Sequence, residues 1–129
     1  MNTHTTQDVM TNIIIEVTVP KETVIDVITT GIEQGIGYWA TDVDKGSLGE
    51  IPMIEKPYTP YYGNFEHPNW ELKITEEGGE IHTLTKEKVA KGFSALHPTR
   101  LANLLSGDYD CIDADCFIQC ALFGSVIYG

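Results

Sequence analysis

The stretch from Asp113 to Tyr128 constrains the fold most, because it is the only long run of the chain with almost no polar residue. Its apolar side chains recur at the spacing of a buried helix that ends at Gly124. We expect Asp113 to cap the helix, with Asp115 in the first turn, where the helix dipole favours an acid. Val126 to Tyr128 would then form a short strand. The sequence therefore predicts a core built around this helix.

The remaining elements follow from the periodicity of the apolar residues. The predicted strands are residues 13–19, 38–43, 70–75 and 80–84. The predicted helices are residues 20–34, 85–96 and 98–107. The last two strands flank a Gly-Gly turn and should form a hairpin. This order predicts an α+β domain with a mostly antiparallel sheet, helices packed on one face and the C-terminal helix buried.

The length and composition predict one domain over residues 1–129, since 42% of the residues are hydrophobic. Residues 1–12 are polar, and we expect them to form a flexible tail. No apolar run is long enough to span a bilayer, and the first residues lack the basic and apolar regions of a secretion signal. A cytoplasmic protein without membrane contact is therefore expected.

A long irregular loop is predicted over residues 44–69, because its four prolines forbid a continuous helix or a central strand. The loop carries the aromatic residues Tyr58, Tyr61, Tyr62 and Phe65 within eight positions. Two interpretations remain open for these rings. They fold the loop back onto the sheet, or they offer a stacking surface to a planar ligand or a partner.

Charge is the strongest compositional feature, since 19 acidic residues against eight basic residues give a formal net charge of −11. Such a charge repels nucleic acid and anionic membranes, so direct nucleic-acid binding is not expected. The same excess suits a protein that docks on a basic groove in place of nucleic acid. Solubility alone also explains it.

Catalytic and metal-binding motifs are weak in this sequence. Four aspartates lie between Asp108 and Asp115, but the glycine and the final glutamate of a calcium loop are missing. Cys116 and Cys120 are one helical turn apart, yet no second pair of ligands accompanies them. The four histidines are dispersed, and no phosphate-binding loop or nucleophile motif is present. We therefore expect neither an enzyme, nor a metal site, nor a cofactor.

Tyr38 and Trp39 follow a glycine-rich break and are the best candidates for ligand contact. In an extended segment their rings point to opposite sides, so that one enters the core and the other lies beside the turn. If such a ring lay beside Lys73, Arg100 or Asn103, the ring would stack on a base while the neighbouring side chain held a phosphate. The alternative is that both rings pack against the last helix. The candidate ligand-binding residues are Tyr38, Trp39, Tyr61, Tyr62, Lys73, Arg100 and Asn103.

Two segments, GIEQGIGYWA and DADCFIQCALFGSVIYG, resemble matching segments of a family of small, mostly uncharacterised proteins of bacteriophages and prophages. The first carries an E-G-x-x-Y-W type segment from Glu33 to Trp39. The second carries a D-x-F-x-Q-x-A-L-F-G-x-x-x-Y-G type signature from Asp115 to Gly129. The resemblance does not cover the proline-rich middle of the chain. It implies a viral accessory protein in the host cytoplasm and carries over no catalytic residue.

Accessory phage proteins of this size often act against host defence, which raises two hypotheses. One is a sponge that sequesters a nucleotide-derived immune signal in a pocket completed by a second subunit, so that a homo-oligomer is expected. The other is an acidic inhibitor that occupies the nucleic-acid-binding groove of a host defence protein. The net charge favours the inhibitor. The aromatic residues favour the sponge, which is the function that the sequence predicts.

Overall fold

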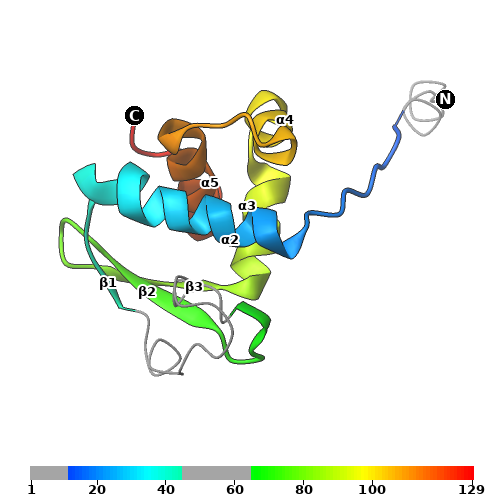
Figure 1. Ribbon diagram of the computed structural model, residues 1–129. Coiled ribbons are helices and arrows are strands. Elements are labelled where there is room, and N and C mark those ends of the chain that lie inside the picture. Colours follow the sequence, from blue (N-terminus) through cyan, green and yellow to red (C-terminus); the bar gives the residue numbers. More distant parts are fainter. Residues whose placement is uncertain (1–11, 45–64) are drawn as a thin grey trace, which may run out of the picture.

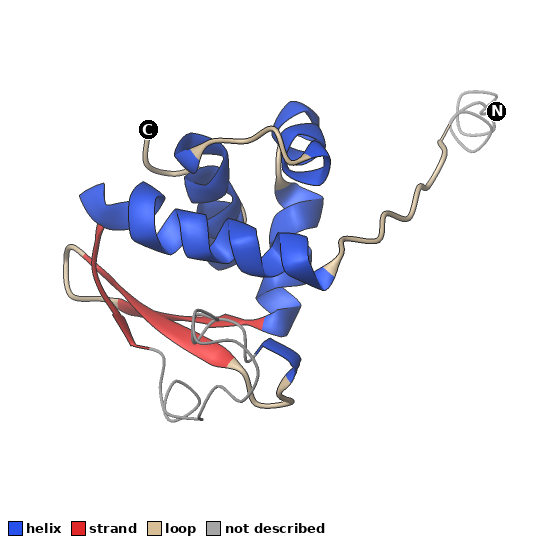
Figure 2. Cartoon of the chain, viewed as in Figure 1, coloured by secondary structure: helices blue, strands red, loops and turns tan. Residues whose placement is uncertain are grey.

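The computed structural model describes residues 12–44 and 65–129 of the chain. These residues form a three-stranded antiparallel sheet in the order β1-β2-β3, with the helices packed on one face (Figures 1 and 2). The predicted α+β fold with an antiparallel sheet is therefore confirmed. The elements in chain order are α2 (Lys21–Thr30), the π-helical turn η1 (Gly31–Gly35), the 3-10 turn η2 (Ile36–Tyr38), β1 (Ala40–Asp44), β2 (Glu71–Glu76), β3 (Ile81–Thr85), α3 (Lys86–Ala95), α4 (Pro98–Ser106) and α5 (Cys111–Phe123).

The β2–β3 hairpin forms as predicted, with the two strands joined through a turn in which Gly79 has a φ of +93°. Leu72 and Ile74 of β2 are buried, whereas Lys73 between them is exposed. This alternation turns the apolar side chains of the central strand toward the helices and Lys73 toward the opposite face of the sheet.

Helix α5 is the centre of the core. All nine residues from Asp113 to Ala121 are buried, and the helix contacts α2, α3, α4, η1 and β3. Its approach to α3 is close: a Cβ atom added to Gly92 of α3 would lie 2.8 Å from the Cβ of Ala121. The predicted burial of the C-terminal helix is confirmed, and Gly124 ends it in the left-handed conformation at a φ of +80°.

The start of α5 differs from the prediction. Asp110, not Asp113, is the N-cap, and its Oδ1 accepts hydrogen bonds from the backbone N–H groups of Ile112 and Asp113. Asp113 is the third helical residue. Its Oδ2 accepts a hydrogen bond from the backbone N–H of Asp110, which completes a capping box. Four closely spaced aspartates offered several possible caps, and the sequence alone did not distinguish among them.

Two predicted strands are wrong. Residues 13–19 have no secondary structure, and the side chains of Ile13, Ile14 and Ile15 are 81%, 93% and 78% exposed. Residues 126–128 do not pair with a strand either. Alternating apolar residues favour an extended backbone, but a strand also needs a neighbour with free backbone groups. Within the described parts of the chain, neither segment has such a neighbour.

The strand predicted from Tyr38 begins two residues later, at Ala40, because the chain first makes the turn η2. The backbone of Trp39, at φ −127° and ψ −14°, is not extended. The two rings therefore do not point to opposite sides, and their actual arrangement defines the candidate site. Most of the tail over residues 1–12 and most of the loop over residues 44–69 lie outside the described residues.

Candidate functional site

Trp39 lies at the junction of η2, β1 and α5 and is 1% exposed. Its indole Nε1 donates a hydrogen bond to Oδ1 of Asp115, over 2.8 Å. Tyr128 stacks on the indole, with ring centroids 5.4 Å apart and an angle of 3° between the ring planes. Phe123 approaches the same indole edge-on, at 5.5 Å. Trp39 is thus enclosed within the chain, as the packing alternative anticipated.

Tyr38 points to the same carboxylate. Its hydroxyl donates to Oδ2 of Asp115 over 2.6 Å, while the residue as a whole is 54% exposed. Burial of the hydroxyl raises the pKa of Tyr38 to about 12, and the hydrogen bond to Asp115 acts in the same direction. The buried Asp115 therefore holds both members of the Tyr-Trp pair, each through a different oxygen.

Gln119 lies one turn further along α5 and fastens the C-terminal residues to this group. Its Oε1 accepts from the backbone N–H groups of Ile127 and Tyr128, at 2.9 Å and 2.8 Å. Its Nε2 donates to the carbonyl of Tyr128 at 3.2 Å and to Oδ1 of Asp115 at 3.0 Å. The one clearly polar interior residue of the apolar run thus replaces the strand partner that residues 126–128 lack.

The hydroxyl of Tyr128 donates to Glu76 at the end of β2, and the other carboxylate oxygen of Glu76 accepts from Nε2 of His82 at 2.6 Å. The hydrogen bond from Tyr128, followed by that from His82, lowers the pKa of Glu76. The same contact with Glu76 raises the pKa of Tyr128. A continuous set of hydrogen bonds therefore runs from the hairpin to the buried carboxylate of α5.

Arg100 and Asn103 of α4 do not join this group. Nη1 of Arg100 donates to Oδ1 of Asp113 over 2.7 Å, and Nδ2 of Asn103 lies 3.4 Å from the other oxygen. This contact raises the pKa of the guanidinium. Asp113 and Asp115 are two positions apart on α5, so their side chains project on different sides of the helix. Arg100, which was predicted to bind a phosphate, is thus held by the buried Asp113, away from the rings of Tyr38 and Trp39.

The remaining predicted ligand residues are placed elsewhere. Lys73 lies on the exposed face of the sheet, opposite to the face that the helices cover. Tyr61 and Tyr62 lie outside the described residues. The structure therefore brings Tyr38 and Trp39 together, and separately Arg100 and Asn103. It does not assemble the five described candidates into one pocket.

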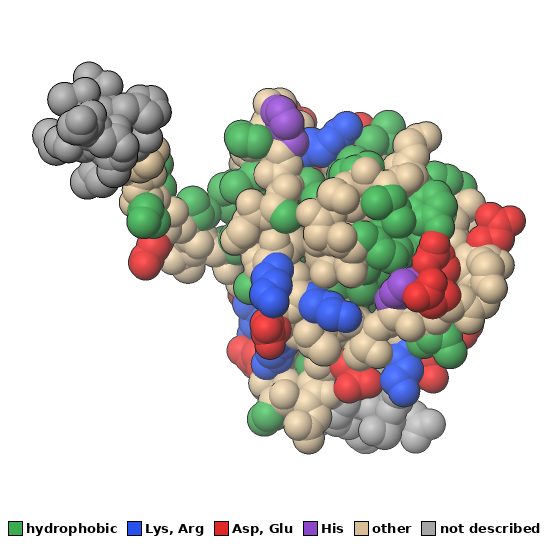
Figure 3. Space-filling view, turned by 180° about the vertical axis from the view of Figure 1, so that it is seen from behind, with side chains coloured by type: hydrophobic (Ala, Val, Ile, Leu, Met, Phe, Trp, Pro, Cys, Tyr) green, Lys and Arg blue, Asp and Glu red, His purple; other side chains and the backbone are tan. Residues whose placement is uncertain are grey.

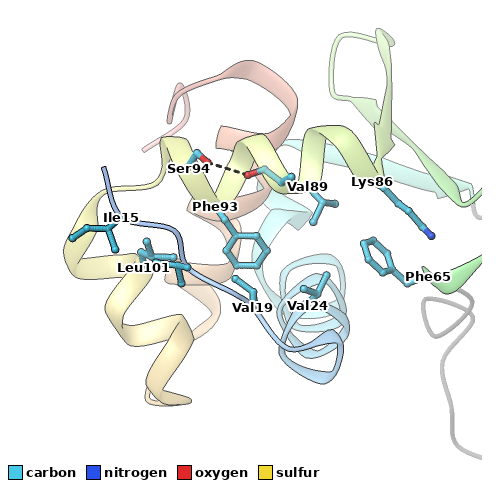
Figure 4. Close-up of a pocket in the computed structure, with 11 residues that line it drawn as sticks. Ile15, Val19, Val24, Phe65, Lys86, Val89, Phe93, Ser94 and Leu101 are labelled. Carbon is cyan, nitrogen blue, oxygen red and sulfur yellow. Dashed lines mark hydrogen bonds between the residues drawn. The ribbon is translucent and has the colours of Figure 1, made fainter. Parts of the chain in front are cut away.

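Two cavities also fail to unite these residues. The larger, of about 670 Å³, lies between the N-terminal segment and helices α2, α3 and α4 and is mostly apolar (Figure 4). A second, of about 470 Å³, lies beside Trp70 and the start of α3. Neither is lined by any of the predicted ligand residues.

Exposed carboxylates recur along the chain from α2 to β1. Among residues 22–43 every charged residue is acidic, and each of these side chains is exposed. We call this set the acidic strip, and its members are Glu22, Asp26, Glu33 and Asp42. The lysine just before it, Lys21, is paired with Glu66 over 2.8 Å. Lysines 86, 88 and 91 belong to α3, and basic side chains are visible on the face turned away from α2 (Figure 3).

One group of side chains in the described part of the chain has the composition of a metal site. One potential ligand atom each from Glu76, Glu80 and His82 lies within 4.8 Å of the other two. Both oxygens of Glu76 already accept hydrogen bonds from the protein, so a cation would have to displace them. Cys116 and Cys120 are buried in the core, where burial raises the pKa of both thiols. We assign no metal to either set.

Sequence reasoning missed the residues that organise this site. Asp115 was expected only to favour the helix dipole, and Gln119, Tyr128, Glu76 and His82 were given no role. A usable signal was present: a glutamine, and an acid one turn before it, inside an otherwise apolar helix need buried partners. Trp39 and Tyr38 carry the donors that such an acid requires.

Comparison with protein-family models, with curated proteins and with solved structures finds no match to this chain. None of the helices formed by the described residues has the length and hydropathy needed to cross a membrane.

Proposed function

We propose that this protein is an acidic inhibitor, which binds the nucleic-acid-binding groove of another protein through the acidic strip. The observation that carries the proposal is the exposure of four carboxylates along α2, η1 and β1, without a basic residue among them. Binding requires no catalytic group. The chain competes with nucleic acid for the groove of the other protein.

The spacing on α2 supports this function. Glu22 and Asp26 are one turn apart on the same side of the helix, which corresponds to about 6 Å along its axis. This distance is close to two steps of about 3.4 Å per phosphate along one DNA strand, so the two carboxylates are spaced like every second phosphate. A groove whose lysines and arginines follow a nucleic-acid backbone therefore meets charges at a comparable pitch.

Sequestration of a nucleotide signal remains a prediction that the described residues support less well. The indole of Trp39 stacks on Tyr128 and makes an edge contact with Phe123. The charge of Arg100 is compensated by Asp113. A base and its phosphate would have to displace contacts within the chain before they could bind, and such a change has to be driven by differential affinity for the opened state.

The resemblance to bacteriophage proteins suggests where the partner is found. A viral accessory protein acts in the cytoplasm of the infected cell, and its targets include host defence proteins that bind DNA or RNA. Long-range attraction between the −11 chain and a basic groove would also speed encounter.

Two charge variants test this proposal. The strip variant carries Glu22→Gln, Asp26→Asn and Glu33→Gln. The matched control carries Glu77→Gln, Glu80→Gln and Asp108→Asn, which are exposed residues outside the strip. Each variant removes three negative charges. The three proteins are immobilised and exposed to a nuclease-treated lysate of a bacterial host, and bound protein is challenged with DNA and RNA.

We expect wild type and control to retain a protein that added DNA or RNA releases, and the strip variant to lose it. Retention by the strip variant, or a bound protein indifferent to nucleic acid, contradicts the proposal. A nucleotide panel that raises the melting temperature of the wild type would instead support sequestration.

A further inference from the structure

The segment from Ile13 to Val19, called the arm here, is an unpaired apolar strand former at the surface. Ile13, Ile14 and Ile15 are 81%, 93% and 78% exposed, and Val17 is 51% exposed. No hydrogen bond joins the arm to another described residue. Such a concentration of exposed β-branched residues is unusual on a monomer and marks an interaction surface.

The large cavity lies directly beside the arm. Ile15, Val17 and Val19 form one wall, and Figure 4 shows Ile15 and Val19 on that side, across from Phe93 of α3 and beside Leu101 of α4. Thr18 and Ile14, on the other side of the arm, do not line it. The cavity, of about 670 Å³, has room for further apolar side chains between the arm and α3.

Charge on the two surfaces is complementary. Among the residues that line the cavity, Lys86 is the only charged one, and it lies where α3 begins, with its Nζ 5.3 Å from the centre of the Phe65 ring. Within the arm, Glu16 is the only charged residue. The cavity is otherwise apolar, so an occupant has to present an apolar face. The arm presents one in Ile15 and Val17, while its single acid, Glu16, lies on the other side and is opposite in sign to Lys86.

We propose that the cavity receives the arm of a second copy of this chain, in a two-fold symmetric dimer. Each chain carries both the donor arm and the receiving groove, so one symmetric contact fills both grooves and leaves no open binding surface. The arriving arm adds antiparallel to the resident arm, and the unpaired N–H and C=O groups of residues 13–19 become bonded. This interface lies apart from the Trp39 and Asp115 site.

The test measures the mass of the full chain by sedimentation velocity over a range of concentrations. Two pairs of variants are compared with the wild type. In the arm, Ile15→Glu faces the groove and Thr18→Glu does not. In the groove, Ala90→Glu places a charge on the cavity wall, while Ala102→Glu adds the same charge to α4 outside the cavity. All four positions are exposed, so the charges do not disturb the core.

We expect the wild type to have twice the chain mass of 14.3 kDa, and both control variants to behave like it. Ile15→Glu and Ala90→Glu should raise the dissociation constant by about tenfold or more, because each buries an unpaired carboxylate. Hydrogen exchange should show protection of residues 13–19 in the dimer and its loss in both groove-facing variants. A monomer at every concentration, or a dimer equally sensitive to the control variants, overturns the proposal.

Discussion

The indole Nε1 of Trp39 and the carboxylate Oδ1 of Asp115 lie 2.8 Å apart, although 76 positions separate them in the chain. The hydroxyl of Tyr38 binds the other oxygen of the same carboxylate at 2.6 Å. The segments around Tyr38-Trp39 and around Asp115 are therefore in direct contact, and the acid of one receives the ring donors of the other. This contact gives both segments a structural role.

Removal of the carboxylate should destabilise the fold strongly. Asp115→Ala leaves the buried indole N–H of Trp39 without its acceptor, and it removes one hydrogen bond each from the Tyr38 hydroxyl and the Gln119 amide. We expect a loss of about 3 kcal/mol or more in the free energy of unfolding, measured with urea. Asp108→Ala, at an exposed position of the same acidic segment, should stay within about 0.5 kcal/mol of the wild type. Equal losses in the two variants would refute the role of Asp115.

The C-terminal residues should detach when Gln119 is shortened. Gln119→Ala removes the acceptor for the N–H groups of Ile127 and Tyr128, so hydrogen exchange of these two amides should become faster. The free energy of unfolding should fall by about 2 kcal/mol or more. Gln34→Ala, at an exposed position of η1, serves as control. Unchanged protection of residues 127 and 128 would show that the side chain does not hold them.

Tyr38 should titrate at unusually high pH. Its pKa in the folded chain is about 12, against the ordinary value of 10.0, so the folded state holds the proton more tightly than the unfolded state. The resulting stabilisation is complete below pH 10.0 and is lost as the pH rises toward about 12. The difference in tyrosinate absorbance between wild type and Tyr38→Phe should have its midpoint near that upper value. A midpoint near 10.0 would mean that the hydroxyl is neither buried nor held by Asp115.

Because α3 packs closely against α5 at Gly92, replacing this glycine with a larger residue should destabilise the fold. Alanine is the better helix former by about 1 kcal/mol, which alone would favour Gly92→Ala. The new methyl group would lie 2.8 Å from the Cβ of Ala121 and 3.0 Å from its Cα, so overpacking should prevail and reduce stability by about 1 to 3 kcal/mol. At Gly37 an added Cβ meets nothing within 4 Å, so Gly37→Ala should be nearly neutral. A more stable Gly92→Ala protein would contradict this packing.

Local patterns predicted the elements whose partners are adjacent in sequence. The β2–β3 hairpin, the helix predicted from Pro98 and the Gly124 end of α5 all depend on residues a few positions apart. The apolar run predicted the burial of α5 because nearly every side of that helix is apolar. These features need no knowledge of how distant segments meet.

Features that depend on distant partners were beyond the sequence. The arm has the composition of a strand, but no pattern in it reveals whether a neighbouring strand exists. For Tyr38 and Trp39 the sequence left open whether the rings contact a ligand or pack against the last helix, because their acceptor, Asp115, lies far away in the sequence. The separation of Arg100 from those rings depends on which side of α5 each aspartate faces, and this is set by the packing of α5 against α4 and η1, elements from other parts of the chain.

The proposed function depends most on Trp39 being a structural residue, so that the partner protein is bound by the outer surface and not by the Trp39 site. The direct measurement is the fluorescence of Trp39, observed alone in a Trp70→Phe chain during titration with a panel of cyclic nucleotides. We predict that its emission stays unchanged through the titration, because Tyr128, Phe123 and Asp115 already surround the indole. A saturable change in emission, together with a rise in melting temperature, would contradict the account and place a nucleotide against Trp39.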